Sequence, residues 1–279
     1  MIDFLTRIRS TEMDPSNTLG IDVYQEIDKV ILKEFDTHFS VPSGEKPDTF
    51  KHYTEYNSYI SNQNEIKLNF SKVFSKILSI INPNNELASL VREQCFLAGG
   101  AIRNFIIRKE INDFDIYFKS RIAADEFSRI VLLADEKCNL QSVFTDSLKI
   151  VSKTDNAITL KSTDLNSVFF KHPIQFITKV TGNPSFVVKT FDFTNCMGYY
   201  DPDDGGKIEI SQMLNAIKWK KLYFNSNSDN PLSSLKRLVK FQYLGFKATE
   251  KCLLDILTAC QKLSKEEIEK FKSGKHLDY

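Results

Sequence analysis

The chain has 279 residues, of which 42% are hydrophobic and 12% are aromatic. This length suits one large domain or two average ones, and the composition can bury a sizeable core, which excludes disorder as the dominant state. Lysine and arginine (37) nearly balance aspartate and glutamate (36), and the net charge of +1 excludes a global field that would draw the whole molecule onto nucleic acid or a membrane.

The five cysteines form neither a CxxC pair nor a cluster with histidine, which argues against a zinc site and against a disulfide framework. No apolar run approaches the ~18 residues that span a bilayer, and the N-terminus lacks the basic-then-apolar order of a signal peptide. We therefore expect a protein of the cytoplasm (the host cytoplasm if the chain is viral) with no membrane association.

Three segments follow one another along the chain. Residues 1–90 are predicted to be a helical N-terminal extension, with a polar, loop-like stretch at 40–64 between two apolar stripes of helical spacing. Residues 91–210 change to short apolar runs separated by polar turns, which is typical of a mixed sheet with helices. Residues 211–279 return to helical patterns. The predicted fold class is α+β, with a central domain between helical parts.

The individual elements follow from the spacing of the apolar residues. Strands are predicted at 95–98, 111–118, 142–145, 148–152, 157–160, 174–180 and 193–200, and helices at 101–108, 122–136, 211–220, 232–244 and 250–263. The acidic, glycine-containing run at 201–206 lacks the later glutamate of an EF-hand loop and is interpreted as a hairpin turn.

A pair of carboxylates stands in the second predicted strand. Residues two apart in a strand face the same side, so Asp113 and Asp115 share one face while Phe114 and Ile116 point to the other. Two adjacent like charges repel, and a divalent cation or a shared proton would neutralise the pair. The alternative is a solvated edge strand with ordinary surface acids, which for an isolated Asp-x-Asp is the commoner case.

The glycine pair before this strand favours a phosphate site. Gly99 and Gly100 lie between a strand and a short helix, an arrangement that exposes backbone N–H groups and directs a helix N-terminus outward. Arg103, one turn into the helix, is placed to add a charge-assisted contact to a phosphate.

Together these segments resemble the signature of the polymerase-β-like nucleotidyltransferase superfamily, in particular its poly(A) polymerase and CCA-adding tRNA nucleotidyltransferase branch. That branch carries Gly-Gly-x-x-Arg-Asp, a spacer, and Asp-x-Asp on the next strand. The matching residues are Gly99, Gly100, Arg103, Asp113 and Asp115, and Asn104 stands where the family has aspartate. The resemblance covers roughly residues 94–250, and the order of motifs is also similar to nucleotidyltransferase-like proteins of bacteriophages.

A later motif of the branch, Arg-Asp-Phe-Thr-Ile-Asn-Ala, is similar to the segment that begins at Phe191. Asp192, Phe193 and Thr194 match, while Phe191 and Cys196 replace the family's arginine and asparagine. By resemblance Asp192 is the third carboxylate of a triad with Asp113 and Asp115 that holds two Mg²⁺ (or Mn²⁺) ions. The resemblance further implies that Gly99, Gly100, Arg103 and Asn104 bind the nucleotide.

The C-terminal part adds a basic stretch. Residues 218–251 contain eight lysines and arginines against two acidic residues, a local excess of 8 − 2 = +6. With the aromatic residues between them, these cations could follow a phosphate backbone and stack on bases, and Lys236, Arg237 and Lys240 are the candidate RNA-binding residues. A solvated helix face is an equally good interpretation of the same pattern.

The leading hypothesis is a Mg²⁺-dependent nucleotidyltransferase that transfers a nucleotide from an NTP to an acceptor hydroxyl, at the 3′ end of an RNA such as tRNA. A rival with the same chemistry transfers the nucleotide to a protein or a small molecule. A rival of another class is an inactive nucleotidyltransferase fold that binds nucleic acid or a partner protein, which the departures at Asn104, Phe191 and Cys196 favour. The presence of all three carboxylates argues against the inactive fold, since such a cluster repels a polyanion.

Overall fold

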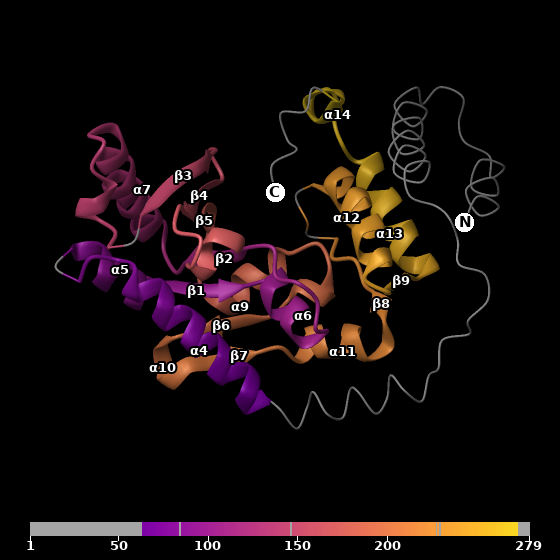
Figure 1. Cartoon of the computed structure of the whole chain (residues 1–279). Helices are drawn as coiled ribbons and strands as arrows, with labels where there is room; N and C mark the ends of the chain where they lie inside the picture. Colours follow the sequence, from indigo (N-terminus) through magenta and orange to yellow (C-terminus); the bar gives the residue numbers. More distant parts are fainter. Residues whose placement is uncertain (1–62, 84, 146, 227, 229, 273–279) are drawn as a thin grey trace. The chain divides into compact units, whose positions relative to one another are not determined.

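The computed structural model describes residues 63–83, 85–145, 147–226, 228 and 230–272 (Figure 1). Within them the chain forms two compact units, a larger one up to residue 228 and a smaller one from residue 230 onward. The predicted N-terminal extension lies outside the described residues as far as residue 62. The mixed sheet flanked by helices confirms the predicted α+β class.

The larger unit contains most of the elements (Figure 1). Its strands are β1 (Cys95–Ala98), β2 (Phe114–Phe118), β3 (Leu148–Lys153), β4 (Ala157–Ser162), β5 (Ile174–Thr181), β6 (Tyr199–Asp201), β7 (Lys207–Glu209) and β8 (Lys221–Leu222). Its α-helices are α4 (Gln63–Ser79), α5 (Glu86–Gln94), α6 (Gly100–Ile106), α7 (Arg121–Glu136), α8 (Val168–Lys171), α9 (Pro184–Val187), α10 (Asp203–Gly206) and α11 (Ser211–Trp219). Three single 3-10 turns complete it: η1 (Leu140–Ser142), η2 (Val188–Thr190) and η3 (Thr194–Cys196).

Seven strands form one sheet in the order β3-β4-β5-β2-β1-β6-β7. Strand β2 pairs in parallel with β5, while the other neighbours in the sheet are antiparallel. All four residues of the central strand β1 are buried. Strand β1 lies between β2 and β6 and is covered on both faces. Its sequence is therefore continuously apolar and does not alternate between apolar and polar residues.

Strand β2 shows the predicted alternation. Phe114 and Ile116 are buried at 3% and 0% exposure, while Asp115 between them is half-buried. On the buried face, Phe127 of α7 stacks on Phe176 of β5 with ring centroids 4.2 Å apart, and Phe118 of β2 lies 5.1 Å from the Phe127 ring. Helix α7 therefore covers this face, and the carboxylate side of β2 is left on the other.

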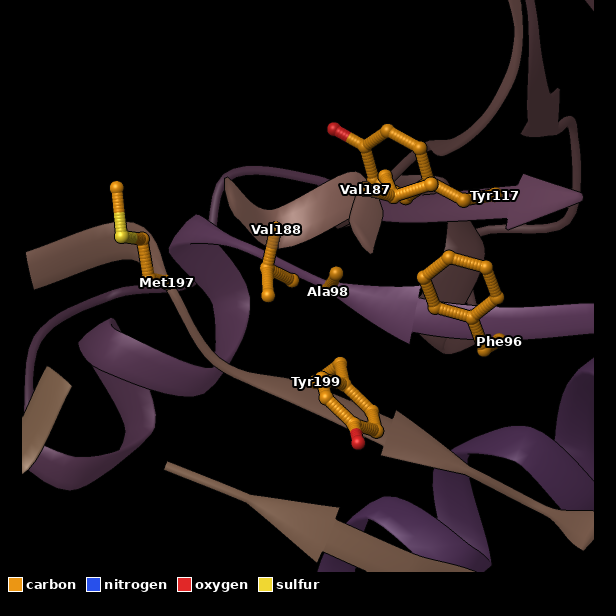
Figure 2. Close-up of a cluster of buried hydrophobic side chains, with 7 residues drawn as sticks. All are labelled: Phe96, Ala98, Tyr117, Val187, Val188, Met197 and Tyr199. Atoms are coloured by element: carbon orange, nitrogen blue, oxygen red, sulfur yellow. The ribbon is translucent and has the colours of Figure 1, made fainter. Parts of the chain in front are cut away.

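A second apolar cluster covers part of that other face (Figure 2). Figure 2 shows Phe96 and Ala98 of β1 between Tyr117 of β2 and Tyr199 of β6, with Val187 and Val188 beside them. Met197 completes the cluster, and Phe191 packs against it from the edge. The cluster fixes the segment 187–199 next to the end of β1, where the glycine pair lies.

Two predicted strands are wrong. Residues 142–145 form the end of η1 and one isolated bridge, between Phe144 and Ile81. Residues 193–200 form η3 and only the start of β6, because the amide of Cys196 bonds to the carbonyl of Phe193 at 3.0 Å and turns the backbone out of the extended state. The segment expected to carry a third carboxylate on a strand is thus a turn.

The smaller unit contains helices α12 (Pro231–Tyr243), α13 (Glu250–Gln261) and α14 (Lys265–Lys272) and the short strand β9 (Lys247–Ala248). Asn230 caps α12 by accepting a hydrogen bond from the Ser233 amide, and Thr249 caps α13 in the same way through Cys252. The predicted boundary at residue 210 differs from this division, because α11 belongs to the larger unit. Helix α14 was not predicted.

The acidic run at 201–206 joins β6 to β7, which pair antiparallel, so its interpretation as a hairpin connection is confirmed. Lys119, just after β2, forms ion pairs with Asp201 at 2.8 Å and Asp203 at 2.5 Å. Burial alone would lower the pKa of Lys119, but the hydrogen bonds and negative charge of Asp201 and Asp203 raise it above its ordinary value.

This ion pair predicts a pH dependence of stability. A lysine whose pKa is higher in the folded state stabilises the fold fully below its unfolded pKa of about 10.4 and loses that contribution as the pH rises through the folded value. We therefore expect the melting temperature of wild type to exceed that of Lys119→Met by a constant difference from pH 7 to about pH 9.5. The difference should shrink at higher pH. Thermal melts of both variants across that range are the test, and a difference independent of pH would contradict it.

Candidate functional site

The glycine turn at the end of β1 is the centre of the site. Gly99 has φ 90° and ψ −138°, a conformation that side chains rarely adopt, and it is the residue before α6 with no side-chain cap. Its amide donates to the carbonyl of Gly198 at 3.0 Å. The Gly99 amide is therefore already bonded within the protein, and the N–H groups of the first turn of α6 are the ones that lack intrahelical acceptors.

The Asp115 carboxylate lies at this turn. A Cβ atom built on Gly99 would stand 3.5 Å from Oδ2 of Asp115, so the carboxylate lies next to the turn. Asp113 is exposed and precedes β2 by one residue. The structure thus brings Gly99, Gly100 and Asp115 together, with Asp113 at the solvent side of the same strand end.

A polar row extends from Asp115 across the sheet and was not found from the sequence. Gln175 of β5 lies directly across from Asp115, and Thr159 of β4 lies across from Gln175. The Gln175 side-chain amide donates to the Thr159 hydroxyl at 3.4 Å. All three side chains are half-buried and share the face that α7 does not cover. No local pattern marks Gln175, because its place beside Asp115 depends on the parallel register of two strands 60 residues apart in sequence.

Phe191, the residue before Asp192, lies beside the glycine turn. The Phe191 ring is 3.7 Å from a Cβ built on Gly99, and its centroid is 5.5 Å from that of Tyr117. Asp192 is 4% exposed, and its backbone carbonyl accepts the amide of Asn225 at 2.7 Å. At the position where the family motif has arginine, this chain has the aromatic ring of Phe191 beside the glycine turn.

Arg103 is directed into the protein. It is 3% exposed, and its Nε and Nη2 both donate to Oδ1 of Asn104, at 3.0 and 2.8 Å. Its Nη1 donates to the sulfur of Cys196 at 2.9 Å, and Asn104 in turn donates to the carbonyl of Glu110 at 2.6 Å. These contacts tie α6 to η3 and to the approach to β2, so Arg103 and Asn104 hold the turn in shape; direct contacts of either residue with a nucleotide stay a prediction.

The η3 segment carries buried polar atoms with no hydrogen-bond partner in the described part of the chain. They are the hydroxyl of Thr194 and both the amide nitrogen and oxygen of Asn195, whose side chain is 0% exposed. Leaving such groups without a partner costs free energy, about 1–3 kcal/mol each. Neighbouring contacts must offset this cost, which no sequence pattern at 194–195 predicts.

The donor set fits a magnesium ion held partly by a substrate. Among the described residues, no three or more histidine, cysteine, aspartate or glutamate side chains are grouped as a metal site. The triad of Asp113, Asp115 and Asp192 stays a prediction. However, Mg²⁺ commonly binds through one or two carboxylates together with substrate phosphates, a set that Asp113 and Asp115 can supply. Mg²⁺ or Mn²⁺ binding stays a prediction.

The candidate RNA-binding residues lie on α12 in the smaller unit. Lys236 and Arg237 are half-buried and Lys240 is exposed, while Leu235, Leu238 and Val239 form the buried side of the helix. In the described chain, no helix is both long enough and apolar enough to pass through a lipid bilayer.

Because Gly99 alone of the pair has a positive φ, the two glycines are expected to differ in their tolerance of substitution. Gly99→Ala should lower the free energy of unfolding by about 1–3 kcal/mol through backbone strain. Gly100→Ala should lower the free energy of unfolding by less, because that position is helical. Its Cβ atom would stand 3.4 Å from Nη2 of Arg103, which is an ordinary van der Waals distance. Urea denaturation of both variants measures the difference, and equal losses would contradict the strained turn.

The fold and the site define an α+β protein in which a glycine turn meets a carboxylate-bearing strand at one sheet end. The chain belongs to the Gabija anti-defense 2 family, whose model matches residues 50–230. Gabija anti-defense 2 of Bacillus phage SPbetaL7 is 27% identical over 186 residues, which cover 66% of this chain and 42% of the relative. The chain thus spans about two fifths of the length of this curated relative.

Solved structures of tRNA-processing enzymes are also similar in part. The Thermotoga maritima CCA-adding enzyme complexed with tRNA is 16% identical with a TM-score of 0.45, over 67% of this chain and 41% of that one. The Bacillus stearothermophilus CCA-adding enzyme in complex with CTP is 13% identical with a TM-score of 0.41, over 61% and 40%. The family finding agrees with the similarity to phage proteins, and the assignment to the CCA-adding branch stays a prediction.

Proposed function

We propose that the chain is a metal-dependent nucleotidyltransferase that transfers a nucleotide from an NTP to an acceptor hydroxyl, with an RNA 3′ end as the acceptor. The acceptor oxygen bonds to the α-phosphorus, and pyrophosphate and the hydroxyl proton are released. The observation that carries the proposal is the position of the Asp115 carboxylate beside the Gly99 turn, with Oδ2 3.5 Å from where a Cβ atom on Gly99 would stand. A triphosphate on the first turn of α6 would lie within reach of this carboxylate, which needs a cation to be tolerated there.

Each group in the site has a proposed part. Asp113 and Asp115 would hold the Mg²⁺ or Mn²⁺ ion, which when bound neutralises phosphate charge during phosphoryl transfer. The glycine turn would allow the phosphates to approach the backbone closely, because glycine has no Cβ atom of its own. Asp192 is the proposed third carboxylate. Phe191 and Tyr117 form an apolar wall next to the turn, against which a base or ribose could pack.

Transfer is tested by incubation of the chain with each labelled NTP, Mg²⁺ or Mn²⁺, and total RNA or total protein, followed by identification of the labelled species. Label on RNA 3′ ends supports the proposal. Label on protein or on a small molecule keeps the chemistry but replaces the acceptor. No label in any arm, with confirmed folding, contradicts transfer and favours the inactive fold.

Family membership supports a second proposal, that the chain counteracts the Gabija defence named in the family description. A phage restricted by Gabija should then form plaques on Gabija-carrying cells that express the chain. The double variant Asp113→Asn with Asp115→Asn separates the mechanisms: loss of plaques would mean that transfer chemistry underlies the effect. Full rescue by the variant would mean that binding alone suffices, and no rescue by wild type would contradict the proposal.

If the acceptor is RNA that contacts α12, the affinity for RNA should depend on the salt concentration. Replacing Lys236, Arg237 and Lys240 together by glutamine should weaken RNA binding and reduce the slope of log affinity against log salt by about 0.7 per lost phosphate contact on a single strand. NTP affinity should not change. An unaltered RNA affinity and slope in the triple variant would instead mean that these residues only solvate the helix.

A further inference from the structure

The exposed surface at the end of α11 is the feature that the proposed site does not use. It consists of the exposed residues Trp219, Lys221 and Tyr223 together with the half-buried Lys218 and Lys220, and we call it the Trp219 surface. Trp219 is 55% exposed and Tyr223 is 39% exposed, although both rings are large and largely apolar. An ordinary surface position does not require either ring, whereas exposed aromatic rings are common in sites that bind other molecules.

The local backbone explains how these side chains come together. Helix α11 ends at Trp219, and Lys220 takes a left-handed conformation with φ 49°, so the chain reverses directly into β8. In the extended segment that follows, Leu222 is 0% exposed, so Lys221 and Tyr223 on either side of it point to the opposite, outer side. Lys221 and Tyr223 therefore lie on the exposed side of this segment, directly after the exposed Trp219 in sequence.

The charge of the Trp219 surface is of one sign. Residues 211–228 contain three lysines and no acidic residue. The Nζ atom of Lys218 lies 5.0 Å from the centroid of the Trp219 ring, a cation–π contact. Lys218 is also placed to interact with the C-terminal end of the α11 dipole, but that effect does not account for Lys221 or for the exposed rings.

The surface is connected to the candidate site through the backbone. The carbonyl of Tyr223 accepts the amide of Thr194 at 3.1 Å, and the amide of Asn225 donates to the carbonyl of Asp192 at 2.7 Å. Residues 223–225 thus run beside the segment that carries Asp192, and Phe193 pairs with Phe224 in an isolated bridge. A ligand on the Trp219 surface would be held at a fixed place on the same unit as the glycine turn.

We propose that the Trp219 surface binds single-stranded nucleic acid, with Trp219 and Tyr223 stacking on bases and Lys218, Lys220 and Lys221 contacting phosphates. A polyanion with accessible aromatic faces matches both parts of the surface, since each base offers a stacking face and each linkage a negative charge. The inference goes beyond the proposed transfer reaction, because binding of the strand needs neither NTP nor metal.

Trp219 is the single tryptophan of the chain, so its fluorescence reports this surface directly. Titration of the full-length protein with a 12-nucleotide oligouridylate, without NTP or Mg²⁺, should quench the emission, because stacking on a base alters the indole environment. An oligothymidylate of the same length is the second arm, which distinguishes RNA from DNA as the strand preferred. Inorganic polyphosphate is the charge control, and it should quench far less because it has no bases.

Variants separate stacking from charge. Trp219→Ala should weaken binding, measured by fluorescence anisotropy of a labelled oligonucleotide, by roughly five- to 150-fold, and Trp219→Phe should restore much of it. The triple variant Lys218→Gln, Lys220→Asn and Lys221→Gln should lower the salt slope by about 2, with asparagine chosen at position 220 because it tolerates a left-handed backbone. The matched control replaces the exposed Lys137, Lys149 and Lys153 by glutamine and should leave the slope nearly unchanged.

Three results would overturn the proposal. The first is the absence of quenching by both oligonucleotides at low salt. The second is equal quenching by polyphosphate, which would identify a general anion surface. The third is an unchanged affinity in Trp219→Ala, and a protein partner would then be the better occupant of the exposed rings. Because none of these measurements uses catalysis, a failure of nucleotide transfer would leave the result intact.

Discussion

Asp115→Asn is expected to reduce nucleotide transfer about a thousandfold or more while the fold is kept. Asparagine has nearly the same size as aspartate but no negative charge, so the variant removes a proposed metal ligand without opening a cavity. Asp115 is half-buried beside Gly99, and Asp113 is exposed, so neither substitution should disturb the core. Asp113→Asn should have a similar effect on transfer. The measurement is the rate of label incorporation from the preferred NTP, alongside a thermal melt.

A matched control and a metal titration sharpen this test. Asp155→Asn alters an exposed carboxylate in the connection between β3 and β4 and should leave transfer unaltered. Millimolar Mg²⁺ or Mn²⁺ should raise the melting temperature of wild type, because a ligand that binds only the folded state stabilises it, and the rise should be smaller in the double variant. Wild-type transfer rates in Asp113→Asn with Asp115→Asn would exclude the proposed chemistry.

Arg103→Ala is expected to lower the free energy of unfolding by about 2–4 kcal/mol. The substitution removes the hydrogen bonds that the guanidinium, in a residue that is 3% exposed, donates to Oδ1 of Asn104 and to the sulfur of Cys196. A direct phosphate contact predicts the reverse: a loss of NTP affinity with little loss of stability. Urea denaturation and NTP binding measured on the same samples decide between the two.

Arg103→Lys is the control for this prediction. Lysine keeps the positive charge but cannot donate two hydrogen bonds in a fork to one Asn104 oxygen. If Arg103 holds the turn in shape, the lysine variant should also be destabilised, by less than the alanine variant. If its charge alone matters, the lysine variant should behave as wild type in both measurements.

The alternation in β2 and the strand–turn–helix at Gly99 could be predicted because both depend on neighbours in sequence. Phe114 and Ile116 face the core while Asp115 does not, as the period of two requires. The apolar stripes of α7, α11, α12 and α13 were predictable for the same reason, since each helix buries one side at a spacing of three to four residues.

What could not be predicted depends on contacts between distant segments. The segment at 193–200 has the β-branched and aromatic content of a strand, but the amides of Cys196 and Met197 bond to carbonyls three residues back and make it a turn. The inward direction of Arg103 follows from the position of Cys196, 93 residues later. Likewise, the neighbour of Asp115 across the sheet is set by a register that no local pattern encodes.

The register between β2 and β5 requires the chain segment that connects these two strands to end at one particular residue. Residues 119–173 follow β2 after Phe118, form α7 and the β3–β4 hairpin at one edge of the same sheet, and lead into β5 so that Ile174 pairs with Phe114. Since the entropy of closing a loop grows only slowly with its length, this stretch can gain or lose residues at its turns at small cost. A shift of β5 by a single residue would instead turn Gln175 to the α7 side and bring an apolar side chain opposite Asp115. Insertions or deletions in the turns of the segment 119–173 are therefore compatible with an intact site. A change in the residue of β5 that pairs with Asp115 is not.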